Sequence, residues 1–137
     1  MNWDLCLKEH IKKVEPDLER VKSIVKMSKV RLKVLRNIKL DDETASVIAT
    51  DYYEVIKELL TALLLKDGLK SDNHECLISY FKYNYNYEYE TKVIHKLKNV
   101  RNRVSYDGVF VKKDYISMNK LEFEHIISLL VKIIDKK

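Results

Sequence analysis

The chain has 137 residues, of which 46% are hydrophobic and 34% charged, and it contains only two Gly and one Pro. So few chain breakers argue against a turn-rich β sandwich and favour long helices joined by short connections. The 26 Lys and Arg exceed the 21 Asp and Glu, and the net charge of +5 permits a nucleic-acid partner without requiring one. The sequence lacks a secretory leader and an apolar run of the roughly 18 residues that span a membrane. We therefore expect one cytoplasmic domain over residues 1–137, without a membrane partner.

Two helices are predicted in the first third of the chain. The first is a short helix within residues 1–15, whose apolar positions at helical spacing are Leu7, Ile11 and Val14. Pro16 interrupts it or lies in the first turn of the next helix, which is predicted over about 17–38. The lysines of that second helix lie mostly opposite its apolar side, as on a solvated surface, and contact with phosphate or RNA is the alternative. The core of the domain is expected to span about 17–135.

The most hydrophobic helix is predicted from an N-cap at Asp41 or Asp42 to about Lys66, with Gly68 ending it in a left-handed conformation. Its apolar stripe is wide, which indicates the central helix. The stripe consists of Ala45, Ile48, Ala49, Tyr52, Val55, Ile56, Leu59, Leu60, Leu63 and Leu64. A short helix follows, in which Ser71 or Asp72 is the expected cap and Glu75 is at the capping-box position.

Alternating tyrosines occupy residues 83–90. Alternation is typical of a strand, but no second strand is predicted, so we expect a loop whose tyrosines lie on the surface or in an interface. Stacking on RNA bases is the alternative. Helices are predicted over about 90–105 and 114–135, joined by a short link at 109–111. Met118 is expected among the buried residues of the last helix. The fold class is therefore all-α, an up-and-down bundle of about five helices.

No metal or cofactor site is expected. Cys6 and Cys76 are far apart and lack CxxC or His-rich neighbours, so buried thiols in a reducing compartment are favoured over a disulfide or a zinc site. The histidines show no HExxH spacing; they are His10, His74, His95 and His125. Two glycines cannot build a Gly-rich phosphate loop.

The stretch 98–108 concentrates more potential chemistry than any other, and it closes with Gly108, which can end the helix. Arg101 flanks the apolar stripe of its helix, so its guanidinium is expected at the edge of the buried face. Arg can bind a phosphate in bidentate fashion, and Asn102 can hydrogen-bond a phosphate, a sugar or a base. Alternatively, Arg101 and Asn102 cap helix ends or pair with Glu54 or Asp51 to hold the bundle together.

Several segments, in their order and spacing, resemble the HEPN superfamily, small all-α domains often encoded beside minimal nucleotidyltransferases. The similar segments are Arg31-Leu32, Asp51-Tyr52-Tyr53-Glu54, Glu58-Leu59-Leu60-Thr61-Ala62-Leu63-Leu64, Asp67-Gly68-Leu69-Lys70-Ser71, His74-Glu75-Cys76-Leu77-Ile78 and Arg101-Asn102-Arg103-Val104-Ser105-Tyr106-Asp107-Gly108. Together they cover about residues 20–110.

The resemblance implies a metal-independent ribonuclease motif in which an Arg binds the scissile phosphate and a His four to six residues later assists the RNA 2′-hydroxyl. It also implies a dimer in which two sites face each other. Arg101 and Asn102 match this motif, but Tyr106 stands where the His is expected. Tyr has an ordinary pKa of about 10 and is a poor base, and loss of a positioned acid or base costs about 10²–10⁴-fold in rate. His74 could replace that His if its helix packs beside Arg101; otherwise it caps or packs.

Three functions follow from these residues. The first is a binding module that holds RNA or a nucleotide and is paired with a minimal nucleotidyltransferase in a toxin–antitoxin-like system. Its expected phosphate ligands are Lys98, Arg101, Asn102 and Arg103. The second is a ribonuclease that uses Tyr106 or His74 in addition to Arg101 and Asn102. The third is a structural partner without a ligand. In each case a homodimer is expected, with the Arg101–Tyr106 face near the dimer cleft, where two copies double the positive potential.

Overall fold

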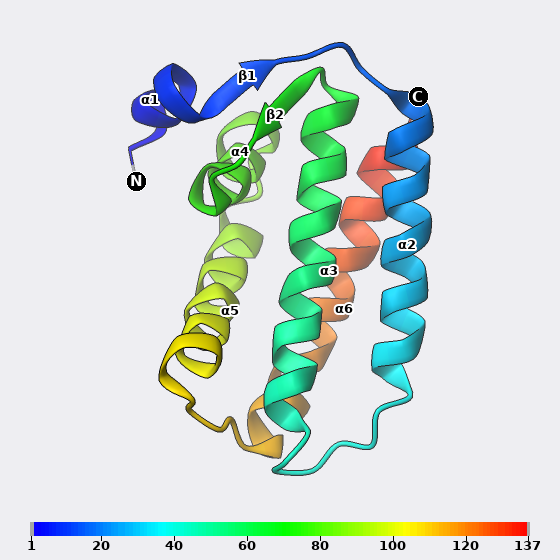
Figure 1. The fold of residues 1–137 in the computed structure, drawn as a ribbon, viewed down its shortest axis with the longest axis vertical. Helices are drawn as coiled ribbons and strands as arrows, with labels where there is room; N and C mark the ends of the chain where they lie inside the picture. Colours follow the sequence, from blue (N-terminus) through cyan, green and yellow to red (C-terminus); the bar gives the residue numbers. More distant parts are fainter. Residues whose placement is uncertain (1, 137) are drawn as a thin grey trace.

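Five long helices make up most of the computed structural model, which describes residues 2–136 (Figure 1). They are α2 (Leu18–Arg36), α3 (Ala45–Lys66), α4 (His74–Tyr85), α5 (Glu88–Asp107) and α6 (Lys113–Asp135). The predicted helical class and the expectation of about five helices are confirmed. None of the described helices is long and apolar enough to cross a membrane.

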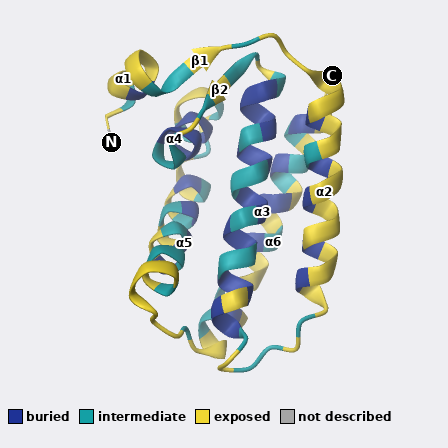
Figure 2. Cartoon of the chain, in the orientation of Figure 1, coloured by how far each residue is buried: buried dark blue, intermediate teal, exposed yellow. Residues whose placement is uncertain are grey.

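Helix α3 is the centre of the bundle, as its composition predicted. It packs against α2, α4, α5 and α6, and Figure 2 shows buried residues along most of its length. All ten apolar positions predicted for its stripe are buried. Burial of each large aliphatic side chain contributes about 1.5–3 kcal/mol, so α3 supplies much of the stabilisation of the bundle. On α6, in contrast, the predicted core residue Met118 is 82% exposed, and that prediction is wrong.

The ends of α3 follow the turn chemistry of the sequence. Asp41 accepts hydrogen bonds from the N–H groups of Glu43 and Thr44, both at 2.9 Å, in the turn that leads into the helix. At the other end Gly68 has a φ of 76°, in the left-handed region that glycine adopts without a steric penalty. The predicted end of the helix is confirmed. The N-cap is Thr44, and not Asp41 or Asp42, so the helix begins at Ala45.

The cap of α4 differs from the prediction. The Asn73 side chain, and not that of Ser71 or Asp72, accepts the N–H of Cys76 at 3.1 Å. Ser71 instead accepts the backbone N–H of Asn73 at 3.2 Å, which shapes the turn ahead of the helix. The helix therefore starts at His74, and Glu75 lies in its first turn.

The predicted N-terminal helix is confirmed over residues 3–10 but not beyond, where the chain forms a strand. A single helical turn, α1 (Trp3–Leu5), is followed by a π-helical turn at Cys6–His10 and a strand, β1 (Ile11–Lys13). β1 pairs in antiparallel fashion with β2 (Leu69–Ser71). Leu7, expected on an inner face, is 52% exposed. An isolated short helix is marginal in water, so pairing with a strand that is distant in sequence determines the conformation of residues 11–13.

The prediction of a tyrosine-rich loop over residues 83–90 is wrong. α4 continues to Tyr85, and α5 begins at Glu88. The break between them is at Asn86, whose φ of 65° is left-handed, a conformation that Asn tolerates better than most residues. The Tyr87 ring then stacks on Phe81 with centroids 4.8 Å apart, which fixes the direction in which α5 leaves.

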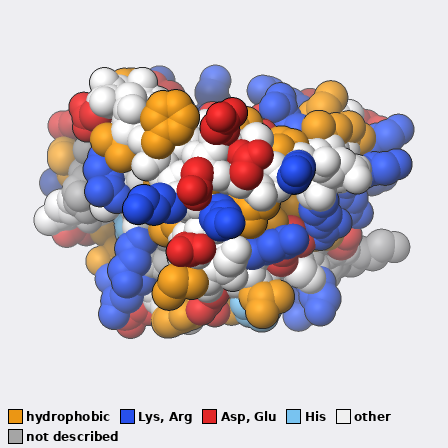
Figure 3. Space-filling view, turned by 90° about the horizontal axis from the view of Figure 1, so that it is seen from below, with side chains coloured by type: hydrophobic (Ala, Val, Ile, Leu, Met, Phe, Trp, Pro, Cys, Tyr) orange, Lys and Arg blue, Asp and Glu red, His pale blue; other side chains and the backbone are white. Residues whose placement is uncertain are grey.

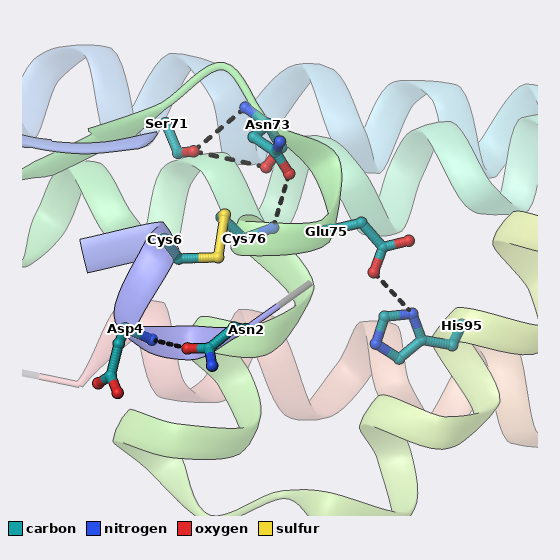
Figure 4. The surroundings of a disulfide bond; sticks show 8 residues. All are labelled: Asn2, Asp4, Cys6, Ser71, Asn73, Glu75, Cys76 and His95. Carbon is teal, nitrogen blue, oxygen red and sulfur yellow. Dashed lines mark hydrogen bonds and ion pairs between the residues drawn. A yellow bond between two sulfur atoms is a disulfide. The ribbon is translucent and has the colours of Figure 1, made fainter. Parts of the chain in front are cut away.

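Cys6 and Cys76 are buried as expected, but they form a disulfide and not two separate thiols (Figure 4). Residues 70 positions apart meet because β1 lies along β2, just before α4 begins. The disulfide therefore joins the N-terminal segment to the first turn of α4. That juxtaposition is tertiary, and the cysteine spacing could not indicate it.

Candidate functional site

Arg101 lies where α5 turns its buried face toward α3. Leu97 and Val100 of α5 are buried, whereas the side chain of Arg101 is 18% exposed. The guanidinium thus lies at the edge of the core, as its place beside the apolar stripe predicted. A partly desolvated cation of this kind interacts more strongly with an anion than one in bulk water does.

Two tyrosine rings lie beside this guanidinium. Its Cζ atom is 5.6 Å from the ring centroid of Tyr53 on α3 and 5.8 Å from that of Tyr106 on α5, both within cation–π range. The Nη1 atom also donates to Asn102 Oδ1 at 3.3 Å and to the Tyr106 hydroxyl at 3.4 Å. Three residues predicted for the site, Arg101, Asn102 and Tyr106, are therefore in direct contact.

The polar contacts of Arg101 leave part of its hydrogen-bonding capacity unused. Glu54, one of the two predicted pairing partners, lies 3.8 Å from Nη2. This distance and those to Asn102 and Tyr106 exceed the usual 2.9–3.0 Å of an N–H···O hydrogen bond. The Nε atom is buried and has no hydrogen-bond partner among residues 2–136. The neighbours of Arg101 therefore orient its side chain but leave some of its N–H groups without a hydrogen-bond acceptor at normal distance.

His74 reaches the same tyrosine from α4. The Tyr53 hydroxyl lies 3.3 Å from His74 Nδ1, and the two ring centroids are 6.1 Å apart. Arg101 and His74 therefore both contact Tyr53, so the helix of His74 packs close to Arg101. We refer to the residues connected in this way as the Arg101 cluster. They are Tyr53, Glu54, His74, Arg101, Asn102 and Tyr106.

Burial shifts the pKa values of two residues of the cluster, His74 and Tyr53. It lowers the pKa of His74, and the nearby positive charges of Lys57 and Arg101 lower it further. His74 is therefore mostly neutral near pH 7 and can accept a proton. Burial also raises the pKa of Tyr53 to about 12, against the opposing effect of Arg101, so this tyrosine keeps its proton.

Tyr53 is the residue that sequence reasoning missed. It occurred there only within the segment similar to HEPN domains, and as a large aromatic residue on the central helix it has the profile of a core residue. It is indeed 1% exposed. The only signal was its position directly before Glu54, a predicted partner of Arg101.

Lys98 and Arg103, the other two predicted phosphate ligands, do not contact the guanidinium of Arg101 in the structure. Lys98 is bonded to Glu75, and its side chain is only 15% exposed. Glu75 also lies 3.5 Å from His95 Nδ1 (Figure 4). Arg103 is exposed, and its charge acts on Tyr115 of α6. Lys98 thus belongs to a neighbouring ion-pair network, and Arg103 faces another helix.

The surface next to the cluster is hollow and partly apolar. A cavity of about 400 Å³ lies between α3 and the end of α5, and its wall includes Thr50, Asp51 and Phe110. Phe110 is 73% exposed and Tyr106 74% exposed. Figure 3 views this end of the bundle and shows basic, acidic and hydrophobic side chains interspersed, without one continuous basic patch. A polyanion would therefore be attracted by individual basic side chains such as Arg101, and not by a broad basic surface.

Residues 2–136 contain no group of three or more His, Cys, Asp or Glu side chains that could hold a metal ion. Comparison of the chain with protein-family models, with curated proteins and with solved structures found no match. The function of the Arg101 cluster therefore has to be inferred from its own geometry and chemistry.

Proposed function

We propose that the protein is a HEPN-like helical domain whose Arg101 cluster binds the phosphate of RNA or of a nucleotide. The observation that carries this proposal is the state of the guanidinium, which is partly buried and held by two tyrosine rings but bonded only at long distances. A phosphate offers charged oxygens at hydrogen-bond distance, and the planar guanidinium binds two of them at once. Such a ligand would replace the weak contacts with strong ones.

The neighbours of Arg101 suit the rest of a nucleotide. Asn102 is half-buried beside the guanidinium, where its amide can hydrogen-bond a phosphate, sugar or base. The exposed rings of Tyr106 and Phe110 offer flat surfaces on which an unpaired base can stack. Stacking of this kind needs bases that are not paired, so single-stranded RNA fits this surface better than duplex RNA.

A metal-independent endoribonuclease is the second candidate, and the position of His74 favours it. A neutral imidazole can take the proton from a 2′-hydroxyl as that oxygen forms a bond to the adjacent phosphorus. The bond from phosphorus to the 5′-oxygen breaks, and water protonates the leaving oxygen. Arg101 would stabilise the negative charge that develops on the phosphate. Of the two residues proposed to replace the usual His, we favour His74, because burial lowers its pKa and leaves the imidazole mostly neutral near pH 7.

A purely structural role is the third candidate. The contact of Arg101 with Glu54 supports it, because this pair and the Tyr53 ring join α5 to α3. An ion pair at 3.8 Å with partial solvent exposure contributes little, typically about 0–1 kcal/mol. The structural role thus predicts a modest loss of stability and no loss of binding when Arg101 is replaced.

The proposed assembly is a homodimer that uses the surface next to the cluster. Tyr106, Val109 and Phe110 are exposed there, as is Val47 on α3. Apolar and aromatic side chains gathered on one face are typical of protein interfaces. The resemblance to HEPN domains also supports a minimal nucleotidyltransferase as a partner in a toxin–antitoxin-like system.

The decisive experiment compares RNA binding and cleavage by the wild type and Arg101→Ala, in the presence of a chelator and at two salt concentrations. Arg20→Ala is the matched control, since Arg20 is an exposed residue at the far end of α2 and the variant loses the same charge. We expect salt-sensitive binding of a single-stranded oligonucleotide by the wild type and by Arg20→Ala. Loss of binding in Arg101→Ala, with its melting temperature retained, supports the binding module.

Cleavage separates the first two candidates. If the wild type cuts RNA in chelator and His74→Ala does not, the protein is a ribonuclease that uses His74. If Arg101→Ala binds RNA as well as the wild type does but melts earlier, the structural role is correct and the proposed binding function is wrong.

A further inference from the structure

A second hollow lies between α2 and α6, away from the Arg101 cluster. Both helices pack against α3 far more extensively than against each other, which leaves a cavity of about 380 Å³ floored by Leu59 of α3. None of the residues of the Arg101 cluster lines it. This volume falls within the usual range of small-molecule sites, roughly 300–1,000 Å³.

A buried hydroxyl without a partner lies in the wall of this cavity. Ser28 of α2 lines the hollow and is 1% exposed, and its Oγ atom makes no hydrogen bond within the described part of the chain. Buried polar groups are almost always hydrogen-bonded, so an exception calls for an explanation. A ligand atom that accepts the Ser28 proton would supply the missing bond.

The mouth of the cavity is positively charged. Lys29 and Lys132 line it, are exposed, and form no ion pair with another residue in 2–136. Arg36 and Glu124 also line the cavity but are bonded to each other, and the Tyr52 hydroxyl donates to Glu124 at 2.7 Å. The charges of that pair cancel, so the two lysines set the sign of the potential at the mouth.

The walls are apolar, and a separate cavity lies further along the same two helices. Leu32, Ile127 and Val131 line the cavity beside Leu59. A further cavity of about 520 Å³ follows toward the start of α2, where Val21 and Val25 face Ile134 of α6. An elongated apolar body could therefore extend from the lysines toward the N-terminal end of α2.

The shape of the groove decides between a narrow ligand and a helix. Val21, Val25, Leu32 and Ile127 are each at most 7% exposed. A helix with its side chains is about 10–12 Å across, so it would rest on the rims and bury little additional surface. A single aliphatic chain is narrower than a helix, so it fits a hollow of this kind better.

We propose that the hollow between α2 and α6 binds an amphipathic carboxylate, such as a medium-chain fatty acid. Its carboxylate lies between Lys29 and Lys132 and accepts the hydroxyl of Ser28. Its aliphatic chain lies against Leu32, Ile127 and Val131 and points toward the second cavity. This site is independent of the RNA-binding function proposed for the Arg101 cluster.

The test is an NMR titration of the ¹⁵N-labelled protein with decanoate. We expect saturable shifts on the segments 25–36 and 124–134. Replacement of both lysines (Lys29→Gln with Lys132→Gln) should weaken binding roughly tenfold, since it removes two charge contacts near the surface. Ser28→Ala should retain the fold and also bind more weakly, because it removes the buried donor. Decanol, which has the same chain without the charge, should bind more weakly to the wild type.

Matched controls separate the site from non-specific adsorption. Lys92→Gln with Lys96→Gln removes two charges from the exposed face of α5 and should bind decanoate as the wild type does. Arg101→Ala should do the same. Shifts spread over the whole molecule, absence of saturation, or equal weakening by the α5 control would each overturn the proposal.

Discussion

At position 101 a side chain of α5 contacts α3, and α4 joins the cluster through Tyr53. Its guanidinium reaches Tyr53 and Glu54 on α3, and His74 on α4 meets the same tyrosine. The guanidinium of Arg101 is partly buried and its polar contacts are long, so an added anion would compete with the carboxylate of Glu54 for it. Two predictions at the scale of single residues follow from this arrangement.

The first concerns Glu54. Glu54→Gln removes the negative charge 3.8 Å from Arg101 Nη2, so we expect the affinity for a single-stranded oligonucleotide at low salt to rise about two- to fivefold. Glu58→Gln is the control, because Glu58 lies on the same helix but pairs with Arg31 at 3.4 Å. Fluorescence anisotropy measures both. Unchanged or weaker binding by Glu54→Gln would mean that the carboxylate orients Arg101 and does not compete with the ligand.

The second concerns His74 and pH. Burial lowers its pKa in the folded protein, whereas the unfolded chain has the ordinary value of about 6.5. The unfolded state therefore binds the proton more readily, and the free energy of unfolding falls as the pH drops below about 6.5. His74→Gln should make this decrease shallower between pH 6.5 and 5, as measured by urea denaturation.

His95 contributes to the same slope, since burial lowers its pKa as well. The single variant should therefore reduce the pH dependence, and the pair His74→Gln with His95→Gln should reduce it further. Parallel stability curves for the wild type and both variants would contradict the proposed depression of these pKa values.

At the scale of elements, the N-terminal segment is held by contacts far away in the sequence. Among residues 2–136, β1 has the three residues of β2 as its sole ladder partner, and the disulfide ties the preceding turn to α4. The same first turn of α4 carries His74, so the anchoring of the N-terminus bears on one residue of the Arg101 cluster.

Removal of the disulfide tests that anchoring. Cys6→Ala with Cys76→Ala should lower the free energy of unfolding by about 2–4 kcal/mol and speed amide exchange in β1 and β2, while α3 stays protected. The wild type in reductant should approach the melting temperature of the double variant, and the variant itself should not respond to reductant. Equal exchange rates in the strands of both proteins would show that the β pairing does not depend on the disulfide.

At the scale of the whole molecule, charge and exposed apolar surface suggest how copies associate. The end of the bundle in Figure 3 mixes both signs of charge with hydrophobic side chains, so two copies can meet there without strong repulsion. Tyr106, Val109 and Phe110 would be buried between them.

We expect light scattering to show a dimer at micromolar concentration and Phe110→Glu to shift it to a monomer. A buried, unpaired carboxylate at an apolar interface is strongly unfavourable. Leu7→Glu places the same charge on an exposed apolar residue of the N-terminal segment and should leave the dimer intact. A monomeric wild type would disprove the proposed assembly.

Local pattern alone determined much of this protein. The helical period of α3 identified its buried face, the glycines at 68 and 108 marked the ends of α3 and α5, and the position of Arg101 beside an apolar stripe placed it at the edge of the core. Each of these depends on interactions between residues a few positions apart, which periodicity and turn chemistry report directly.

Only the tertiary structure decided the features that join distant segments. The pairing of residues 11–13 with 69–71, the Cys6–Cys76 bond and the approach of His74 to the tyrosine beside Arg101 all depend on how whole helices pack. The short N-terminal segment has little structure of its own to oppose such contacts, and Tyr53 was hidden because a buried tyrosine in the core and one in a site look the same in sequence. The helices were thus determined by local periodicity, and the site by their packing, which brings one face from each of three helices together.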